Sequence, residues 1–298
     1  MGKVALLAIR AQRRKKPFED PRVLRDQILA ERRSVTHPPP RSLARRVSIR
    51  ETTIRGRPCY TLSPLGGRDE QKRRIFFLHG GCYVFEIVPE HWHFVARLVE
   101  VLHATVTVPI YPLAPEAGYR DAHEMVLEAY RALAKDTSAD RIALMGDSAG
   151  GGMALALAQS INKNGLPRPA DIVLLSPWLD VTMTNPDITE IEPRDPWLAR
   201  PGLVEAGRMY AQGDDPKGSL VSPIYGELEG LGRISIFIGT RDILLADARK
   251  LHASAKDKGI DVQLYESEGM FHDWMFAPIP EAKETLASIA QILARVRA

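Results

Sequence analysis

A serine at position 148 lies in a setting that favours nucleophilic chemistry. Residues 146–151 read GDSAGG and directly follow an apolar run over residues 142–145. That run is short enough for a buried strand, whereas the small residues and helix formers after it predict a helix over residues 150–160. A serine at so abrupt a strand-to-helix turn is held in a strained backbone geometry, with its hydroxyl above the sheet edge. The flanking glycines leave room for the turn.

A serine hydroxyl needs a general base, and the base needs a carboxylate that orients it. At such a turn the acid and then the histidine follow the serine along the chain. Only His252 and His272 lie after Ser148. His252 falls within a predicted helix among lysines, which indicates a surface position. His272 falls in a loop after a predicted strand and before the last helix, so we predict that it is the base.

Three aspartates are candidates for the orienting acid. Asp242 falls just past a predicted strand over residues 234–238, at the sheet edge that carries Ser148. Asp247 comes a turn later, where it would cap or flank the next helix. Asp273 is adjacent to His272, and most loop geometries would point its side chain away from the ring. We therefore predict Asp242.

Acyl transfer also needs hydrogen-bond donors for the developing oxyanion, and removing one costs about 2.7–4 kcal/mol. The sequence His79-Gly80-Gly81-Cys82 directly follows the predicted strand over residues 75–78. Its glycines let the backbone approach the substrate and turn N–H groups inward. The N–H of Ala149, at a helix start, is a further donor. We expect the backbone N–H of Cys82 to matter more than its thiol.

Each motif alone has an ordinary structural explanation, because a GxSxG or HGG sequence can be a simple turn and His272 a loop histidine. Their combination and order favour catalysis.

His91 and His93 lack the further ligands of a metal site, and no phosphate or dinucleotide motif occurs, so we predict no metal and no cofactor. Five residues could line an acyl pocket, although core packing would explain them equally well: Phe85, Trp178, Trp197, Met270 and Trp274.

The pattern of apolar segments predicts an α/β protein. Residues 46–63 alternate apolar and polar positions around Gly56, as in a hairpin. From residue 75 onward, short apolar strands alternate with helical stretches, which predicts a mostly parallel sheet with helices on both faces. The predicted strands cover residues 75–78, 105–108, 142–145, 172–175, 234–238 and 262–265, and the predicted helices cover residues 89–102, 121–135, 150–160, 245–258 and 281–297.

Two regions depart from this alternation. Residues 1–45 are polar, basic and predicted to be helical in two pieces, and residues 178–220 form an insertion that we place over the carboxyl edge of the sheet. Residues 46–298 then form the main domain. The first 50 residues hold fourteen Lys and Arg against four Asp and Glu, which we interpret as a solvated helix face rather than a lipid-binding one.

Composition narrows the class of protein further. The chain has 298 residues, of which 45% are hydrophobic and 26% charged, with a net charge of +3, so nucleic acid is not an expected partner. No run approaches a membrane span and no signal-peptide pattern is complete. The two cysteines, Cys59 and Cys82, suggest no disulfide framework, so we expect a cytoplasmic protein. A homodimer through the last edge strand is possible.

The chain resembles the hormone-sensitive-lipase-like group of α/β-hydrolases, which contains many bacterial esterases. The resemblance implies Ser148 as nucleophile, Asp242 as acid and His272 as base. The matching segments are His79-Gly80-Gly81, residues 111–116 (YPLAPE), 146–151 (GDSAGG), 176–178 (SPW), 195–198 (DPWL), 222–223 (SP), 239–242 (GTRD) and 269–272 (GMFH).

The same resemblance implies an oxyanion hole formed by the N–H groups of Gly81, Cys82 and Ala149, with His79 and Gly80 supporting the loop. It also implies a helical cap built from the N-terminal segment and the insertion. Most members have a third glycine where this chain has Cys82, whose Cβ restricts the loop and narrows the site. We expect hydrolysis of small, short-acyl esters, with amide or formamide hydrolysis, or a non-catalytic receptor, as alternatives.

Overall fold

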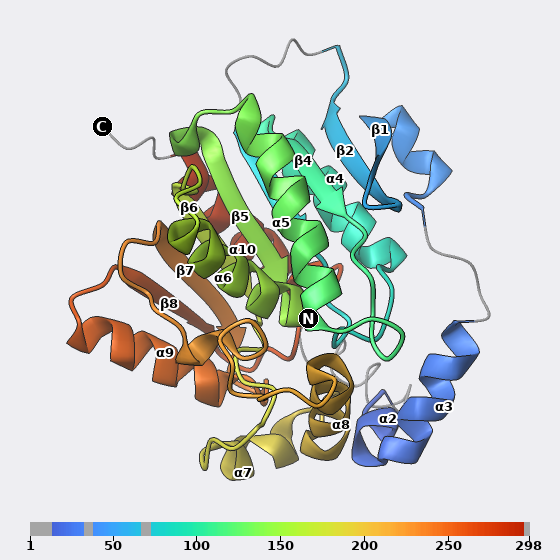
Figure 1. The fold of residues 1–298 in the computed structure, drawn as a ribbon, viewed down its shortest axis with the longest axis vertical. Helices are drawn as coiled ribbons and strands as arrows, with labels where there is room; N and C mark the ends of the chain where they lie inside the picture. The colour runs from blue at the N-terminus through green and yellow to red at the C-terminus, as the bar shows by residue number, and fades with distance from the viewer. Residues whose placement is uncertain (1–13, 33–37, 67–72, 295–298) are drawn as a thin grey trace.

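The computed structural model describes residues 14–32, 38–66 and 73–294. Eight strands form one sheet in the order β1-β2-β4-β3-β5-β6-β7-β8 (Figure 1). The strands are β1 (Val47–Ile54), β2 (Arg57–Pro64), β3 (Arg74–Leu78), β4 (Thr105–Pro109), β5 (Ile142–Asp147), β6 (Asp171–Leu175), β7 (Arg233–Gly239) and β8 (Val262–Ser267).

The sheet is mostly parallel, as predicted. β1 and β2 form the expected hairpin, with Val47 opposite Pro64 and a tight turn at Arg55 and Gly56, both of which have positive φ. β2 also pairs antiparallel with β4, and every later pairing is parallel. The carboxyl ends of the parallel strands therefore meet at one edge, where ligands bind in such sheets.

Helices cover both faces of the sheet because its strands are apolar on both sides. One face packs against α5 (Tyr119–Lys135), α6 (Ser148–Lys163) and α9 (Leu245–Asp257), and the other packs against α4 (Pro89–Leu102) and α10 (Pro280–Ala294). Figure 1 shows α5 and α6 in front of the sheet and α10 behind it. The prediction of an α/β fold is confirmed.

Short helices gather beyond one end of the sheet (Figure 1). From the N-terminal segment come α2 (Lys16–Glu19) and α3 (Pro21–Glu31), and from the insertion come α7 (Ile188–Ile191) and α8 (Arg200–Ala211). Parts of the predicted N-terminal helical segment, residues 1–13 and 33–37, lie outside the described residues.

The N-terminal helices pack directly on α8. A Cβ at Gly202 would overlap the backbone of Phe18, so glycine permits this close approach. Arg25 and Glu205 form an ion pair of 2.8 Å between α3 and α8. Two segments far apart in the sequence thus form one helical layer.

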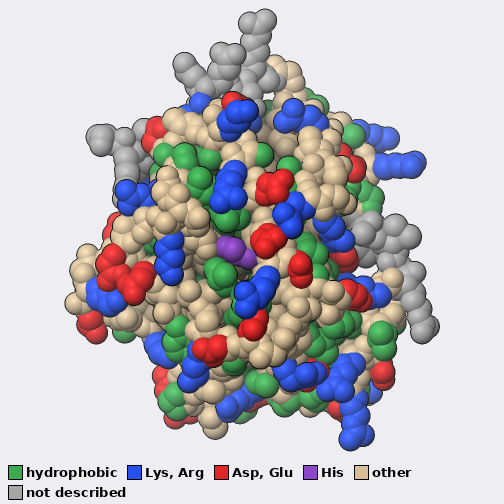
Figure 2. Space-filling view, in the orientation of Figure 1, with side chains coloured by type: hydrophobic (Ala, Val, Ile, Leu, Met, Phe, Trp, Pro, Cys, Tyr) green, Lys and Arg blue, Asp and Glu red, His purple; other side chains and the backbone are tan. Residues whose placement is uncertain are grey.

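The surface in the view of Figure 1 carries interspersed basic and acidic side chains (Figure 2). Among the residues that the structure describes, no helix combines the length and apolar character that crossing a membrane requires.

Candidate active site

Ser148 lies at a sharp turn between β5 and α6. Its φ is 50°, in the left-handed region that non-glycine residues rarely adopt. A Cβ at Gly146 or Gly150 would overlap the backbone around this turn, so both positions require glycine. The carbonyl of Ser148 accepts a hydrogen bond of 2.8 Å from the N–H of Trp178, which fixes the turn against the segment after β6.

Asp242 and His272 come together at the same edge of the sheet. Nδ1 of His272 is 2.8 Å from Oδ2 of Asp242, and both residues are buried. Oδ1 of Asp242 accepts a hydrogen bond of 3.0 Å from the N–H of Leu244, so the carboxylate is held from two sides. Asp247 instead accepts from the amide of Asn185 at 2.9 Å, at the start of α9.

Asp273 also contacts His272, contrary to our expectation. Its Oδ2 lies 3.1 Å from Nε2 of the imidazole. We expected an ordinary loop conformation, but Asp273 adopts a left-handed backbone (φ 53°, ψ 34°), which turns its side chain back toward the ring. Its N–H donates to Oγ of Ser176 at 3.2 Å.

These carboxylates determine the protonation of the histidine. Burial alone would lower the pKa of His272, but Asp273 and Asp242 together outweigh burial and hold this pKa well above its usual value. Burial raises the pKa of Asp273 to about 6. Within the described part of the chain, Oγ of Ser148 makes no hydrogen bond to the imidazole. The structure therefore brings His272 together with Asp242 and Asp273, and not into hydrogen-bond contact with Ser148.

The loop after β3 contains the predicted oxyanion donors. Gly81, Cys82 and Tyr83 all have positive φ, and the carbonyl of Gly81 accepts hydrogen bonds of 2.9 and 2.8 Å from the N–H groups of Val84 and Phe85. A Cβ at Gly81 would overlap the carbonyl of Phe85. Among the described residues, the N–H groups of Gly81 and Cys82 donate to no protein acceptor.

Asp147 connects this loop to the turn at Ser148. Its Oδ2 accepts a hydrogen bond of 2.9 Å from the N–H of Gly80 and another of 3.0 Å from Nε2 of His91 on α4. Nδ1 of His91 in turn accepts from the N–H of Val88 at 3.1 Å, which fixes the proton on Nε2. Burial lowers the pKa of His91, but Asp147 outweighs it and the pKa is raised.

His79 and Tyr111 brace the loop from its other side. Nδ1 of His79 donates to the carbonyl of Gly80 at 2.7 Å, and the hydroxyl of Tyr111 donates to the carbonyl of His79 at 2.5 Å. The two rings are stacked with centroids 4.4 Å apart. Burial and the neighbouring His91 lower the pKa of His79 to about 4, so the ring is neutral at pH 7.

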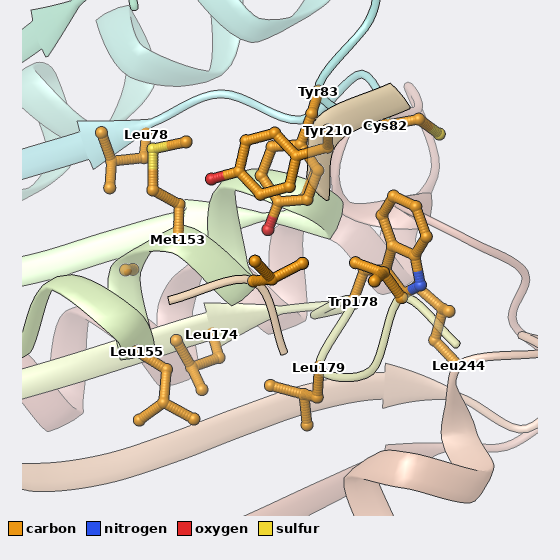
Figure 3. Close-up of a cluster of buried hydrophobic side chains, with 14 of the residues drawn as sticks. Leu78, Cys82, Tyr83, Met153, Leu155, Leu174, Trp178, Leu179, Tyr210 and Leu244 are labelled. Carbon is orange, nitrogen blue, oxygen red and sulfur yellow. The ribbon is translucent and has the colours of Figure 1, made fainter. Parts of the chain in front are cut away.

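The loop also contacts the helical layer. Tyr83 stacks on Tyr210 of α8 with centroids 3.7 Å apart and an interplanar angle of 6°, and Trp178 lies beside them at 5.6 Å from Tyr83 (Figure 3).

Burial raises the pKa of the Cys82 thiol to about 12. The thiol is therefore protonated and unreactive at neutral pH.

Asp195, in the insertion, supports the loop that carries Asp242. Its Oδ2 accepts a hydrogen bond of 2.8 Å from the N–H of Ile243. Its own carbonyl accepts from Nζ of Lys15 at 2.9 Å, so the N-terminal segment fastens the same point. Burial and the neighbouring Asp242 raise the pKa of Asp195 to about 7.

Trp197 follows Asp195 and reaches the catalytic histidine candidate. Its ring meets His272 edge-on, with centroids 5.8 Å apart and an interplanar angle of 87°. The guanidinium of Arg14 lies 4.7 Å above the ring of Trp197. From the sequence, residues 195–198 were a matching motif and gave no indication of these supporting roles.

The structure divides the five proposed pocket residues. Phe85 and Trp197 are half-buried at the site, and Met270 lines a cavity of about 420 Å³ between β8 and α10. Trp178 and Trp274 are fully buried in the core, Trp274 on the face covered by α4 and α10, which agrees with the alternative of core packing, and a role for either in an acyl pocket stays a prediction. In the described ranges, no group of three His, Cys, Asp or Glu side chains could hold a metal ion.

Ser148 lies in a strained turn after β5, Asp242 follows β7 and His272 follows β8. This placement is the arrangement of a serine hydrolase on an α/β sheet. Comparison with known proteins agrees. Residues 75–276 match the family model described as alpha/beta hydrolase fold, and the chain belongs to this family, within its hormone-sensitive-lipase-like group.

Named relatives and solved structures give the same result. The chain is 34% identical to an acetyl-hydrolase of Streptomyces hygroscopicus over 72% of this chain and 73% of that protein, and 32% identical to an esterase of Acinetobacter venetianus over 73% of each. The structure of an esterase from the bacterial hormone-sensitive lipase family superposes with a TM-score of 0.82 at 30% identity, covering 98% of this chain and 97% of that one. The chain is a carboxylic ester hydrolase.

Proposed function

We propose that this hydrolase cleaves short-acyl carboxylic esters through an acyl-enzyme formed on Ser148. The observation that carries the proposal is the buried pair of His272 and Asp242, which lies at the same sheet edge as the strained serine. A histidine oriented by a carboxylate is the base that a serine hydroxyl needs.

The reaction follows from these roles. Nε2 of His272 accepts the proton of the Ser148 hydroxyl as Oγ attacks the ester carbonyl, and Asp242 stabilises the imidazolium through Nδ1. The same proton then passes to the alcohol as it leaves. Water attacks the acyl-serine with His272 again as base, which releases the acid and restores the hydroxyl.

The N–H groups of Gly81, Cys82 and Ala149 are our candidates for the oxyanion hole. Those of Gly81 and Cys82 have no protein acceptor in the described residues, and Ala149 lies in the first turn of α6, where N–H groups are free of helical partners. Each such donor contributes about 2.7–4 kcal/mol to transition-state stabilisation.

The preference for short acyl chains rests on the crowding of the site. Ser148 is 3% exposed, and the oxyanion loop carries Cys82 and Tyr83 in left-handed conformations under α8. One relative is named an acetyl-hydrolase, and EstE5, a structural neighbour with a TM-score of 0.79 at 28% identity over 92% of this chain and 90% of that one, was soaked with p-nitrophenyl butyrate. We expect p-nitrophenyl acetate and butyrate to be cleaved faster than octanoate.

Ser148→Ala tests the proposal. We expect loss of ester hydrolysis and of labelling by a fluorophosphonate probe, with unchanged thermal unfolding. Ser160→Ala is the matched control, because Ser160 is also a buried serine of α6 but bonds His123 rather than the site. Retained turnover in Ser148→Ala would refute the assignment, and faster cleavage of a matched anilide than of the ester would favour the amidase alternative.

We further propose that the protein works in a reducing compartment, as expected for the cytoplasm. Cys59 and Cys82 are both free thiols. A homodimer through the edge strand β8 stays a prediction.

A further inference from the structure

The imidazole of His272 lies between two carboxylates, and the mechanism above uses only one of them. Nδ1 is 2.8 Å from Asp242, and Nε2 is 3.1 Å from Asp273. Nε2 is the nitrogen that must accept the proton of Ser148. Asp273 therefore occupies the contact that the nucleophile needs.

The backbone of Asp273 is fixed, whereas its side chain has one partner among residues 14–32, 38–66 and 73–294. The N–H donates to Oγ of Ser176, whose own N–H donates to the carbonyl of Phe237 at 2.7 Å, so the left-handed conformation is tied to β7. The carboxylate is 9% exposed, and its Oδ1 has no hydrogen-bond partner among the described residues. Within the part of the chain that the structure describes, the contact with His272 is the one that holds this carboxylate, so it can be released without loss of another hydrogen bond from these residues.

The surrounding charges favour a protonated imidazole. A positive ring placed between two carboxylates is stabilised by both, and an opposite charge within about 4–6 Å raises the pKa of a histidine by about 1–3 units. The Cys82 thiol interacts electrostatically with His272 but is protonated at neutral pH. The titratable groups that act on His272, Asp273 or their partners from neighbouring elements are Asp242, Asp147, His91, Asp195 and Cys82.

We propose that Asp273 is a positioning residue that holds His272 as an imidazolium away from Ser148 in the resting enzyme. Turnover then requires the Nε2–Asp273 ion pair to break and the imidazolium to lose its proton to water, after which Nε2 accepts the Ser148 proton. The proposal rests on the catalytic roles of Ser148 and His272 given above. It implies that Asp273 determines the pH at which the hydrolase becomes active.

Asp273→Asn tests the proposal, because asparagine keeps the size of the side chain and tolerates the left-handed conformation. The measurement is kcat/KM for p-nitrophenyl acetate from about pH 5 to about pH 9, whose acidic limb reports the free enzyme's base. We expect the midpoint of this limb to fall by about one pH unit or more, so that activity below the midpoint rises about tenfold. Asp273→Gly, which also suits the backbone, should shift the limb in the same direction.

Asp247→Asn is the matched control. Burial raises the pKa of Asp247 to about 6, as in Asp273, but Asp247 contacts Asn185 and not His272. The control should leave the acidic limb unchanged. An unshifted limb in both Asp273 variants, or an equal shift in Asp247→Asn, would overturn the proposal. Since Ser148→Ala tests the nucleophile separately, either result would leave the ester hydrolase assignment intact.

Discussion

Replacing Asp147 should reduce catalysis more than stability if the loop after β3 forms the oxyanion hole as proposed, because Asp147 holds this loop in place. One oxygen, Oδ2, accepts both the N–H of Gly80 and Nε2–H of His91. The other oxygen, Oδ1, has no hydrogen-bond partner among the described residues. Two substitutions therefore separate the charge of the carboxylate from its hydrogen bonds.

Asp147→Asn can place its amide oxygen where Oδ2 lies and its NH₂ where Oδ1 lies, so both hydrogen bonds persist without charge assistance. Hydrogen bonds to charged groups contribute about 1.5–3 kcal/mol and neutral ones about 0.5–1.5 kcal/mol, so we expect kcat/KM to fall about tenfold. Asp147→Ala removes both acceptors and leaves the N–H of Gly80 buried and unpaired. If the loop then misplaces one oxyanion donor, kcat falls about 10²–10³-fold.

Steady-state hydrolysis of p-nitrophenyl acetate gives kcat and KM for each variant, with thermal unfolding as a check on folding. Asp171→Asn is the control. Asp171 is also a buried carboxylate, but it lies at the start of β6, whereas Asp147 lies at the end of β5, and it pairs with Arg73 and Arg233. It should change the unfolding temperature and leave kcat within about twofold. A folded Asp147→Ala protein with near-normal kcat would show that this carboxylate does not position the loop.

Two further predictions concern stability. Tyr210→Ala removes the ring that stacks on Tyr83. We expect the unfolding free energy, measured by thermal or urea denaturation, to fall by about 3–5 kcal/mol and KM to rise. An unchanged KM would show that α8 does not shape the site. Burial raises the pKa of Asp247 to about 6, compared with about 3.9 in unfolded chains. The folded state therefore loses stability as the pH rises from about 4 to about 6 and Asp247 ionises. Asp247→Asn keeps the hydrogen bond to Asn185 but cannot ionise. The unfolding free energy of this variant minus that of the wild type should therefore rise by up to about 3 kcal/mol between pH 4 and pH 7. A difference that does not depend on pH would contradict this prediction.

The sheet could be predicted from sequence because its strands are short apolar runs separated by helical patterns. The hairpin over residues 46–63 has alternating apolar and polar residues, whereas the strand before Ser148 is a continuous apolar run. The helix bounds differ by a few residues from the prediction: α6 begins at Ser148 itself rather than at residue 150.

The supporting side chains could not be predicted, because their contacts depend on backbone conformations that sequence does not reveal. Asp273 contacts His272 only through its left-handed φ, and His91 reaches Asp147 only because α4 packs beside the loop after β3. A signal for His91 existed, since a histidine in an apolar helix segment needs a buried partner. The sequence alone did not show which partner.

The cluster of buried carboxylates connects the helical layer to the sheet edge that carries Ser148. Carboxylates brought this close repel one another and lose hydration, so the fold must supply donors. Asp147 obtains them from α4 and the oxyanion loop, Asp242 from His272 and Leu244, and Asp195 from the backbone at Ile243. Because Asp195 belongs to the insertion and is fastened by the N-terminal segment, loosening the helical layer should also loosen the loop of Asp242. Truncation of the N-terminal helices should therefore lower kcat as well as alter substrate binding.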